Sequence, residues 1–235
     1  MPSAARYFVP VCLYPHTRYR TSAGVTALFQ KYELRVHDYL IVVADRLSVL
    51  DRLVTGRYWT ADSATVKARQ EARQVVGLIE RTRKKMGARG NGRVVFWDDI
   101  AETAQFAAFA GRLRAELSAD PMVMGAIEEF CERRARRFGL GNAPDRERSY
   151  EREYLLSEIC MSVFCTEVLG FCTEIWERPP AADAPNPLKL LYDVRPEMVE
   201  RLTGRSVSRA LTFLYPESHG TVGGPEHPAS LQAFV

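Results

Sequence analysis

The chain has 235 residues, of which 46% are hydrophobic and 10% aromatic, enough to bury the core of one large domain, so intrinsic disorder is excluded as the default. The formal net charge is a modest +3 at pH 7, but Lys and Arg gather in a few segments while the acids are spread along the chain. No window approaches the ~18 uninterrupted apolar residues of a membrane span and no signal-peptide core follows Met1, so we expect a cytoplasmic protein that contacts no membrane.

The N-terminal part of the chain alternates apolar strands with amphipathic helices. The run at 39–45 is apolar until it reaches Asp45, which is typical of a strand buried on both faces of a parallel sheet. The long helix that follows ends at a glycine-rich turn. In chain order we expect a strand over 7–13, a helix over 22–33, a strand over 39–45, a helix over 61–86 and a strand over 93–97.

The rest of the chain is mostly helical. Asp98 can cap an alanine-rich amphipathic helix, and a later helix capped near Ser149 carries an apolar run. Several prolines then forbid a continuous helix. The expected elements are helices over 100–117 and 120–138, a polar break over 139–148, a helix beyond Ser149, a returning strand over 170–176, and short helices over 188–192 and 196–202.

Strands that alternate with helices predict an α/β fold, a Rossmann-like doubly wound parallel sheet with helices on both faces. We expect a single domain over residues 1–218 and a Gly- and Pro-rich, mobile tail over 219–235. The ligand crevice of such a sheet lies at the carboxyl ends of the strands, which places the segments after Leu13 and Asp45 beside it.

Several common cofactor and hydrolase motifs are missing. No Gly-x-Gly-x-x-Gly follows the first strand and no Walker loop is found, so we expect no dinucleotide or nucleotide cofactor. The lack of Gly-x-Ser-x-Gly weighs against an ordinary serine hydrolase. The five cysteines are an odd number in mostly apolar surroundings, and the spacing of Cys160, Cys165 and Cys172 fits no usual ligand pattern, so neither a disulfide framework nor a metal site is predicted.

The most informative feature is Tyr154-Leu155-Leu156-Ser157-Glu158. A spacing of four residues puts the phenol of Tyr154 and the carboxylate of Glu158 on one face of a helix, where they form a candidate acid/base pair. Taken alone, the same spacing also describes a buried aromatic residue beside a solvated acid.

The helix over 61–86 has a basic side and an apolar side, the latter carrying Val66, Val76 and Ile79 at helical spacing. A basic stripe suits phosphodiesters, because each cation that neutralises a phosphate releases a counterion. The alternative is a solvated helix face rich in arginine. A second cluster strengthens the nucleic-acid interpretation only if it lies on the same surface; it consists of Arg133, Arg134, Arg136 and Arg137. The candidate nucleic-acid-binding residues are Lys67, Arg69, Arg73, Arg81, Arg83, Lys84 and Lys85.

The chain resembles the cyclodipeptide synthases, a family similar in fold to the catalytic domain of class I tyrosyl- and tryptophanyl-tRNA synthetases. The resemblance covers most of the chain, and its Tyr-x-x-x-Glu spacing at Tyr154 and Glu158 matches the family's catalytic pair. The further matching segments are Val42-Val43-Ala44-Asp45, Lys67-Ala68-Arg69, Val94-Val95-Phe96-Trp97-Asp98, Asp120-Pro121-Met122, Val168-Leu169-Gly170 and Ile175-Trp176-Glu177-Arg178-Pro179.

The resemblance implies an enzyme that joins the aminoacyl groups of two aminoacyl-tRNAs into a cyclic dipeptide through a covalent aminoacyl-enzyme. No ATP is needed because the esters arrive activated, which agrees with the missing phosphate loops and the missing HIGH- and KMSKS-type signatures. Carried over to this chain, Glu158 accepts the proton of the incoming amino group and Tyr154 holds the ammonium of the aminoacyl moiety.

The chain departs from the family pattern at two catalytic positions. Where the family has its nucleophilic serine, this chain has Cys12, so a thioester replaces the oxygen ester; a buried, inert cysteine is the alternative, and Thr17 or Ser22 then serves. The family's second tyrosine aligns with Trp176, which has no hydroxyl, and Tyr192 replaces it if the chain loops back.

The substrate contacts are less securely matched. His16 is the nearest candidate for the polar residue that follows the nucleophile in one branch of the family. A fungal branch makes arginine-containing cyclodipeptides, and a guanidinium needs a carboxylate partner, for which Asp45 and Glu174 are candidates. The competing functions are a noncatalytic RNA-binding relative that has lost the nucleophile and an ordinary α/β hydrolytic or nucleotide enzyme, for which the chain offers no motif.

Overall fold

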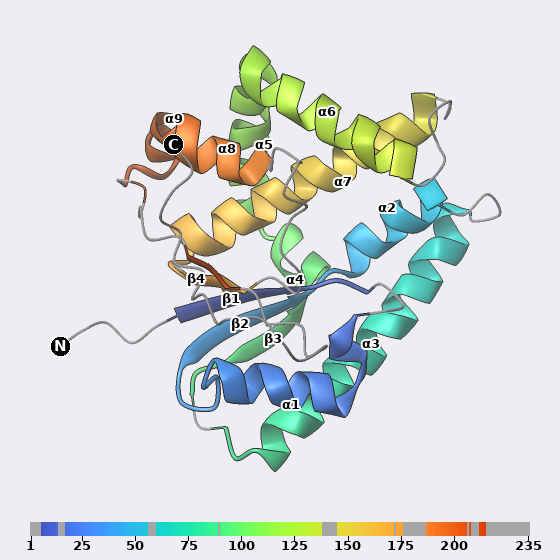
Figure 1. The fold of residues 1–235 in the computed structure, drawn as a ribbon, viewed down its shortest axis with the longest axis vertical. Coiled ribbons are helices and arrows are strands. Elements are labelled where there is room, and N and C mark those ends of the chain that lie inside the picture. The colour runs from blue at the N-terminus through green and yellow to red at the C-terminus, as the bar shows by residue number, and fades with distance from the viewer. Residues whose placement is uncertain are drawn as a thin grey trace, which may run out of the picture.

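The computed structural model describes residues 6–13, 17–55, 60–88, 90–137, 145–171, 173–175, 187–205, 207 and 212–214. A central sheet separates two helical layers (Figure 1). Within the described residues the sheet has five parallel strands in the order β3-β2-β1-β4-β5. These strands are β1 (Arg6–Val11), β2 (Asp38–Val43), β3 (Arg93–Phe96), β4 (Thr173–Ile175) and β5 (Thr212–Leu214).

The strand order reverses at β1, because β2 and β3 lie on one side of it and β4 and β5 on the other. On one side β1 pairs with β2 along its whole length, from Arg6 opposite Asp38 to Val11 opposite Val43. On the other side it pairs with β4, with Phe8 opposite Glu174. In an open parallel sheet a ligand binds outside the carboxyl ends of the strands where the order reverses, so the end of β1 is the expected site.

The helices form one thin and one thick layer. The described helical elements are η1 (Arg18–Arg20), α1 (Ser22–Lys31), α2 (Asp45–Thr55), α3 (Ala61–Lys85), α4 (Trp97–Ala101), α5 (Ala104–Ala119), α6 (Pro121–Arg137), α7 (Asp145–Val163), the π-helix η2 (Phe164–Val168), α8 (Pro187–Val194) and α9 (Pro196–Thr203). Within the described part of the chain, no helix is both long and apolar enough to cross a membrane.

Side chains alternate along the strands and so supply two separate cores. In β2, Ile41 points into the core shared with α1 and α3, whereas Leu40 and Val42 point into the core shared with α5 and α7. Figure 1 shows α1 and α3 on one face of the sheet, and α5 to α9 on the other. Helix α2 lies beyond the end of β2 and contacts both α3 and α7.

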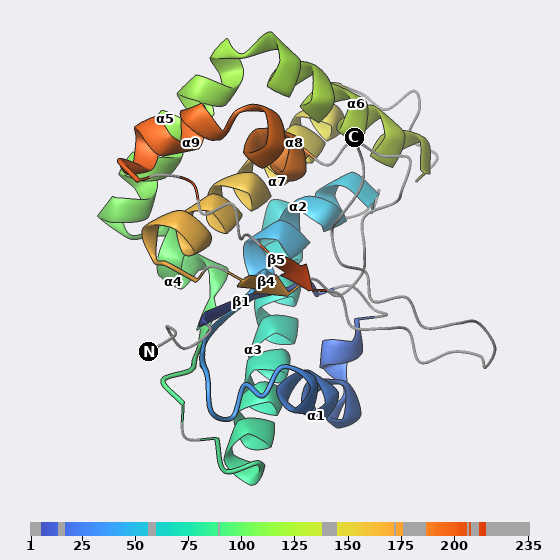
Figure 2. The same cartoon turned by 60° about the vertical axis from the view of Figure 1, so that its left-hand side comes forward.

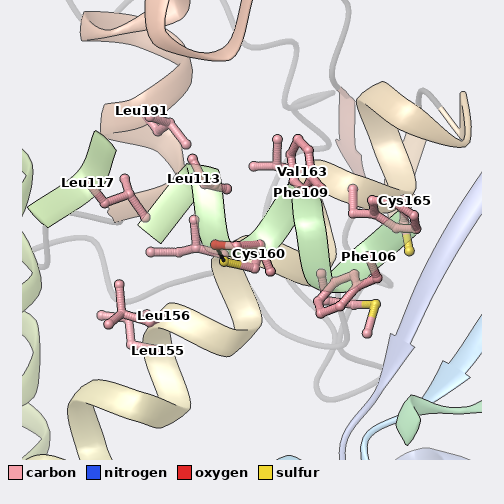
Figure 3. Close-up of a cluster of buried hydrophobic side chains, with 14 of the residues drawn as sticks. Phe106, Phe109, Leu113, Leu117, Leu155, Leu156, Cys160, Val163, Cys165 and Leu191 are labelled. Atoms are coloured by element: carbon pink, nitrogen blue, oxygen red, sulfur yellow. Dashed lines mark hydrogen bonds between the residues drawn. The ribbon is translucent and has the colours of Figure 1, made fainter. Parts of the chain in front are cut away.

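Helix α7 is held against α5 by a continuous apolar seam. Figure 3 shows Leu113 and Phe109 of α5 facing Cys160 and Val163 of α7, with Leu191 of α8 closing the seam. Figure 2 shows the same layer from the side, with α8 and α9 resting over α7. Each fully buried aliphatic side chain in this seam contributes ~1.5–3 kcal/mol, so α7 has a firm backing on the side away from the pocket described below.

The structure confirms the α/β class and most predicted elements, but differs from the prediction in four places. The helix predicted over 100–117 is broken into α4 and α5, because the hydroxyl of Thr103 donates to the carbonyl of Ile100 (2.7 Å) and accepts from the N–H of Phe106 (3.2 Å), which caps a new helix. The start of α4 is capped by Asp99, whose carboxylate accepts a hydrogen bond from the N–H of Phe96 at 2.8 Å. The predicted cap, Asp98, does not have this role.

The other corrections concern α2 and α7. Helix α2 was not predicted, since Asp45 was taken as the end of a strand, yet it is the first residue of this helix. Helix α7 begins at residue 145, before the predicted cap at Ser149. Strand β5 was also not predicted. The predicted tail over 219–235 lies outside the described residues.

Candidate active site

A pocket lies at the carboxyl ends of β1 and β2, where the strand order predicts a ligand crevice. The hollow between its walls measures roughly 200 Å³ with open solvent included, of which about 10 Å³ has room for a water molecule. One wall comes from the chain just after β1, a second from the start of α2, and a third from α7. The lining residues are Cys12, Leu13, Ala44, Leu47, Ser48, Asp51 and Tyr154.

Cys12 follows β1 directly, and its partly exposed side chain faces the pocket. The two alternative nucleophiles predicted from the sequence are not among the residues that line it. The hydroxyl of Thr17 accepts from the N–H of Tyr19 at 3.4 Å and so caps η1, while Ser22 is the exposed first residue of α1. Cys12 is therefore the one of the three predicted nucleophiles that the structure places at the pocket.

Ser48 is a second candidate nucleophile that the sequence analysis did not identify. It is buried at the start of α2 and lines the pocket with Cys12. Its Oγ accepts a hydrogen bond from Nη1 of Arg52 at 2.5 Å. The guanidinium occupies a lone pair of this hydroxyl oxygen and draws electron density from it, which makes Ser48 a weaker nucleophile than a partly exposed thiol.

Tyr154 and Glu158 stand one turn apart on α7, and Tyr154 belongs to the same buried cluster as Cys160 and Val163. Tyr154 is 4% exposed and lines the pocket. Glu158, one turn further along, is partly buried, and this burial raises its pKa to about 7. The positive charge of Arg134 acts in the opposite direction and limits the rise. A carboxyl group with this pKa exchanges protons readily near neutral pH, as a general base must.

A buried ion cluster lies behind Tyr154. Arg134 of α6 contacts Oδ1 of Asp51 at 2.5 Å and Oε2 of Glu151 at 2.8 Å, and its guanidinium stands 4.3 Å from the centre of the Tyr154 ring. Burial raises the pKa of Asp51 and of Glu151, and Arg134 opposes both increases. The sequence counts Arg134 in a second basic cluster that supports nucleic-acid binding only on a shared surface, but its side chain is 14% exposed and pairs with buried carboxylates.

The two carboxylates predicted to bind substrate are buried but do not line this pocket among its described residues. Asp45 accepts from the N–H of Trp97 at 3.2 Å, and its pKa is raised to about 6 by burial and by the neighbouring charge of Asp98. Glu174 of β4 is 0% exposed and accepts from the hydroxyl of Ser162 at 3.0 Å.

Tyr192, the alternative second tyrosine, does return to the neighbourhood of Glu174. Its hydroxyl lies 2.9 Å from that of Thr166 in η2. Burial raises the pKa of Tyr192 well above its ordinary value, and the charges of Glu167 and Glu174 add to this. Trp176 and His16, the two other predicted site residues in this region, lie outside the described residues.

Helix α3 presents an exposed row of cations. The side chains of Lys67, Arg69, Arg73, Arg81, Lys84 and Lys85 are exposed, whereas Arg83 is partly buried over the ring of Tyr39. Arg69 pairs with Asp98 at 3.3 Å, and Arg83 pairs with Glu80 at 3.5 Å. Val66, predicted on the buried side, is instead 69% exposed among these cations.

A second charge network joins α3 to the pocket. Glu71, on the buried face of α3, contacts Arg20 at 2.5 Å and Arg52 at 2.8 Å, with Lys67 at 3.6 Å. Burial acts to raise the pKa of Glu71, but the hydrogen bonds of the two arginines lower it overall. Because Arg52 also holds Ser48, a surplus of positive charge extends from the exposed row to the pocket wall.

No family model and no curated protein matches the chain by sequence. Comparison with solved structures does find proteins of similar fold. A cyclodipeptide synthase from Fluoribacter dumoffii superimposes with a TM-score of 0.66 at 13% identity, over 90% of this chain and 89% of that one. The cyclodipeptide synthase AlbC from Streptomyces noursei gives 0.63 at 15% identity, over 92% and 96% of the two chains.

The chain has the cyclodipeptide synthase fold. A cyclodipeptide synthetase from Mycobacterium tuberculosis, a protein related to type I tRNA synthetases, agrees with a TM-score of 0.61 at 16% identity over 82% of this chain and 79% of that one. Tyrosyl-tRNA synthetase from Pyrococcus horikoshii gives 0.50 at 13% identity, over 89% of this chain but 50% of the synthetase. The cyclodipeptide synthase fold thus extends over nearly the whole chain.

Proposed function

We propose that the protein is a cyclodipeptide synthase, an aminoacyltransferase that joins the aminoacyl groups of two aminoacyl-tRNAs into a diketopiperazine. The observation that carries this proposal is the meeting of Cys12 and Tyr154 in one pocket at the carboxyl end of β1, with Glu158 one turn along α7. The shared fold supports the reaction class, and the pocket residues supply its chemistry.

The first step transfers one aminoacyl group to the enzyme. The sulfur of Cys12 attacks the ester carbonyl, the ester C–O bond breaks, and the terminal hydroxyl of the tRNA leaves with the thiol proton. The product is an aminoacyl thioester at Cys12. Both the ester and the thioester are activated acyl groups, so no ATP is consumed and no cofactor is required.

The second and third steps form the two peptide bonds. The amino group of the bound residue attacks the ester of the second aminoacyl-tRNA, which releases that tRNA and leaves a dipeptidyl thioester. The new terminal amine then attacks the thioester carbonyl, closes the ring and returns the thiol of Cys12. Glu158 accepts the proton from each attacking amine and passes it to the leaving group, while the hydroxyl of Tyr154 holds the amine in place.

We propose that the exposed cations of α3 bind the tRNA acceptor arm. Arg73, Arg81, Lys84 and Lys85 are exposed along one helix, and the network at Glu71 continues their charge toward the pocket. Cations spaced along a helix neutralise successive phosphates without reading sequence, which suits an enzyme that accepts more than one tRNA.

We also propose arginine as one of the two joined residues. A guanidinium taken out of water needs a carboxylate partner, and Glu174 and Asp45 are buried carboxylates near the ends of β4 and β2. Mixtures of purified charged tRNAs test this directly. Product that requires arginyl-tRNA supports the proposal, whereas equal product without it contradicts it.

The second candidate function is a noncatalytic RNA-binding protein of the same fold. The observation in its favour is the cysteine at the position of the family's serine, beside an exposed basic helix. Small molecules released by a bacterial host that expresses the protein decide between the two, with Glu158→Gln analysed beside it. A cyclic dipeptide lost in the variant supports the synthase. No product from either protein, also after charged tRNAs are added in vitro, favours the RNA-binding protein.

A further inference from the structure

Arg134 is a largely buried cation at the junction of three helices. From α6 it reaches Asp51 of α2 at 2.5 Å and Glu151 of α7 at 2.8 Å, and its guanidinium covers the face of the Tyr154 ring at 4.3 Å. The side chain of Arg134 is 14% exposed and that of Glu151 is 3% exposed. One guanidinium thus links two of the pocket walls, because Asp51 and Tyr154 both line the pocket.

Fold stability alone is a poor explanation for this cluster. Taking ionised side chains out of water costs free energy that their mutual attraction often fails to recover, and apolar residues of similar size serve as well or better. Here the Arg134 guanidinium contacts two buried carboxylates, and burial raises the pKa of both. Clusters of this kind occur where a neighbouring group must be held in a defined orientation or charge state.

We propose that Arg134 is a positioning residue of the active site. Its two salt bridges fix α2 against α7, its plane fixes the Tyr154 ring, and its positive charge acts on Glu158. The inference rests on the proposed cyclodipeptide synthesis, in which Tyr154 must hold an amine and Glu158 must accept its proton. Arg134 itself touches neither the substrate nor the reacting atoms.

The charge environment of Glu158 agrees with this role. Burial raises the pKa of Glu158 to about 7, and Arg134 is the charged group that opposes the rise. Without this cation Glu158 would remain protonated at neutral pH and could not accept a proton. Titratable and charged groups lie around this part of α7 on every neighbouring element. They include Arg134 from α6, Asp51, Arg52 and Arg46 from α2, Arg114 from α5, Cys12 after β1, and Glu151, Glu153, Tyr154 and Cys160 from α7 itself.

An NMR titration tests the charge effect without any need for enzymatic activity. Glutamate labelled with ¹³C at the carboxyl group reports each protonation, and Glu158→Gln identifies the signal of Glu158. In Arg134→Gln the midpoint is expected to rise by roughly one pH unit or more, because an adjacent opposite charge has been removed. In Arg134→Lys, which keeps the charge, the midpoint stays near that of the wild type.

Arg114 provides a matched control because it pairs, from α5, with a glutamate of the same helix α7. Its guanidinium grips Glu153 of α7 with two hydrogen bonds of 2.7 and 2.8 Å, but from α5 and on another face. Arg114→Gln therefore breaks a comparable pair and should leave the Glu158 midpoint unchanged. An unmoved midpoint in Arg134→Gln, or an equal shift in Arg114→Gln, overturns the inference.

The pH dependence of kcat/KM for product formation provides the second test. If the Glu158 midpoint moves from about pH 7 to about pH 8, the ionised fraction at pH 7 falls from one half to about one tenth, so Arg134→Gln loses roughly fivefold in rate there and recovers at higher pH. Arg134→Lys loses rate equally at every pH, because the ring is less well held while the charge remains. An equal loss at every pH in Arg134→Gln shows a merely structural role.

Two further arrangements keep the test decisive. If Arg134→Gln does not fold, because Asp51 and Glu151 are left as unpaired buried carboxylates, the triple variant with Asp51→Asn and Glu151→Gln removes that cost. Its reference is the double variant with Asp51→Asn and Glu151→Gln, from which it differs only in the charge of Arg134, and the same rise of the Glu158 midpoint is predicted between these two proteins. If the wild-type protein makes no product, the proposed function fails, while the NMR titration still decides whether Arg134 sets the charge state of Glu158.

Discussion

Substitution of Glu158 by Gln should stabilise the protein at alkaline pH although it abolishes product formation. In the folded chain the pKa of Glu158 is raised from 4.5 to about 7, chiefly by burial, against the opposing charge of Arg134. Between these two values the folded state holds a proton that the unfolded state has released, so the free energy of unfolding falls as the pH rises through this window.

The size of the effect follows from the gap between the two pKa values. At ~1.4 kcal/mol for each pH unit, the cost of ionising Glu158 in the folded state reaches about 3 kcal/mol above pH 7 and disappears below pH 4.5. Gln has the shape of the neutral acid and never ionises. Glu158→Gln should therefore exceed the wild type by about 2–3 kcal/mol at pH 8 and match it near pH 4.

Urea unfolding of both proteins at a series of pH values measures this difference. Glu153→Gln is the matched control on the same helix: burial acts to raise the pKa of Glu153, but Arg114 and Ser157 lower it overall, so its loss should destabilise the protein at neutral pH. The reasoning is refuted if the difference in the free energy of unfolding between the wild type and Glu158→Gln does not change with pH. Glu158 would then have the same pKa in the folded and the unfolded state.

Three further predictions concern the nucleophile, the basic helix and the core. Cys12→Ala should abolish product while Ser48→Ala leaves most of it, as measured by mass spectrometry of the reaction; the reverse result assigns the acyl group to Ser48. Arg73→Glu with Arg81→Glu should weaken tRNA binding and lower the slope of log Kd against log salt by about 1–2, and an unchanged slope assigns α3 to a solvated face. Leu113→Ala should lower the free energy of unfolding by ~2–5 kcal/mol, and a loss below 1 kcal/mol would contradict the tight seam between α5 and α7.

Much of the fold was predictable because its signals are local. The strand β2 is signalled by the continuous apolar run at 39–43, and the 25-residue basic helix α3 by its helical periodicity. Both lie where the sequence predicts. Helix α2 was missed although Leu47, Leu50 and Val54 have helical spacing, because the strand before it merges into the helix at Asp45 with no intervening loop.

The site was less predictable because its contacts are distant in sequence. Spacing alone placed Tyr154 and Glu158 on one face of α7, and the strand order explains why Cys12 meets Tyr154. No local pattern relates Asp51 to Arg134, which are 83 residues apart, so Arg134 looked like one more surface arginine. Charge counts along a chain cannot separate a solvated guanidinium from a buried one.

The most direct test of the proposed activity is an ATP-free reaction of the purified protein with isolated tRNAs charged with labelled amino acids. The wild-type protein is predicted to move the label from tRNA into a cyclic dipeptide, and Glu158→Gln is predicted to leave the cyclic dipeptide unformed. If the label remains on tRNA with the wild-type protein for every charged tRNA supplied, the protein is not a cyclodipeptide synthase.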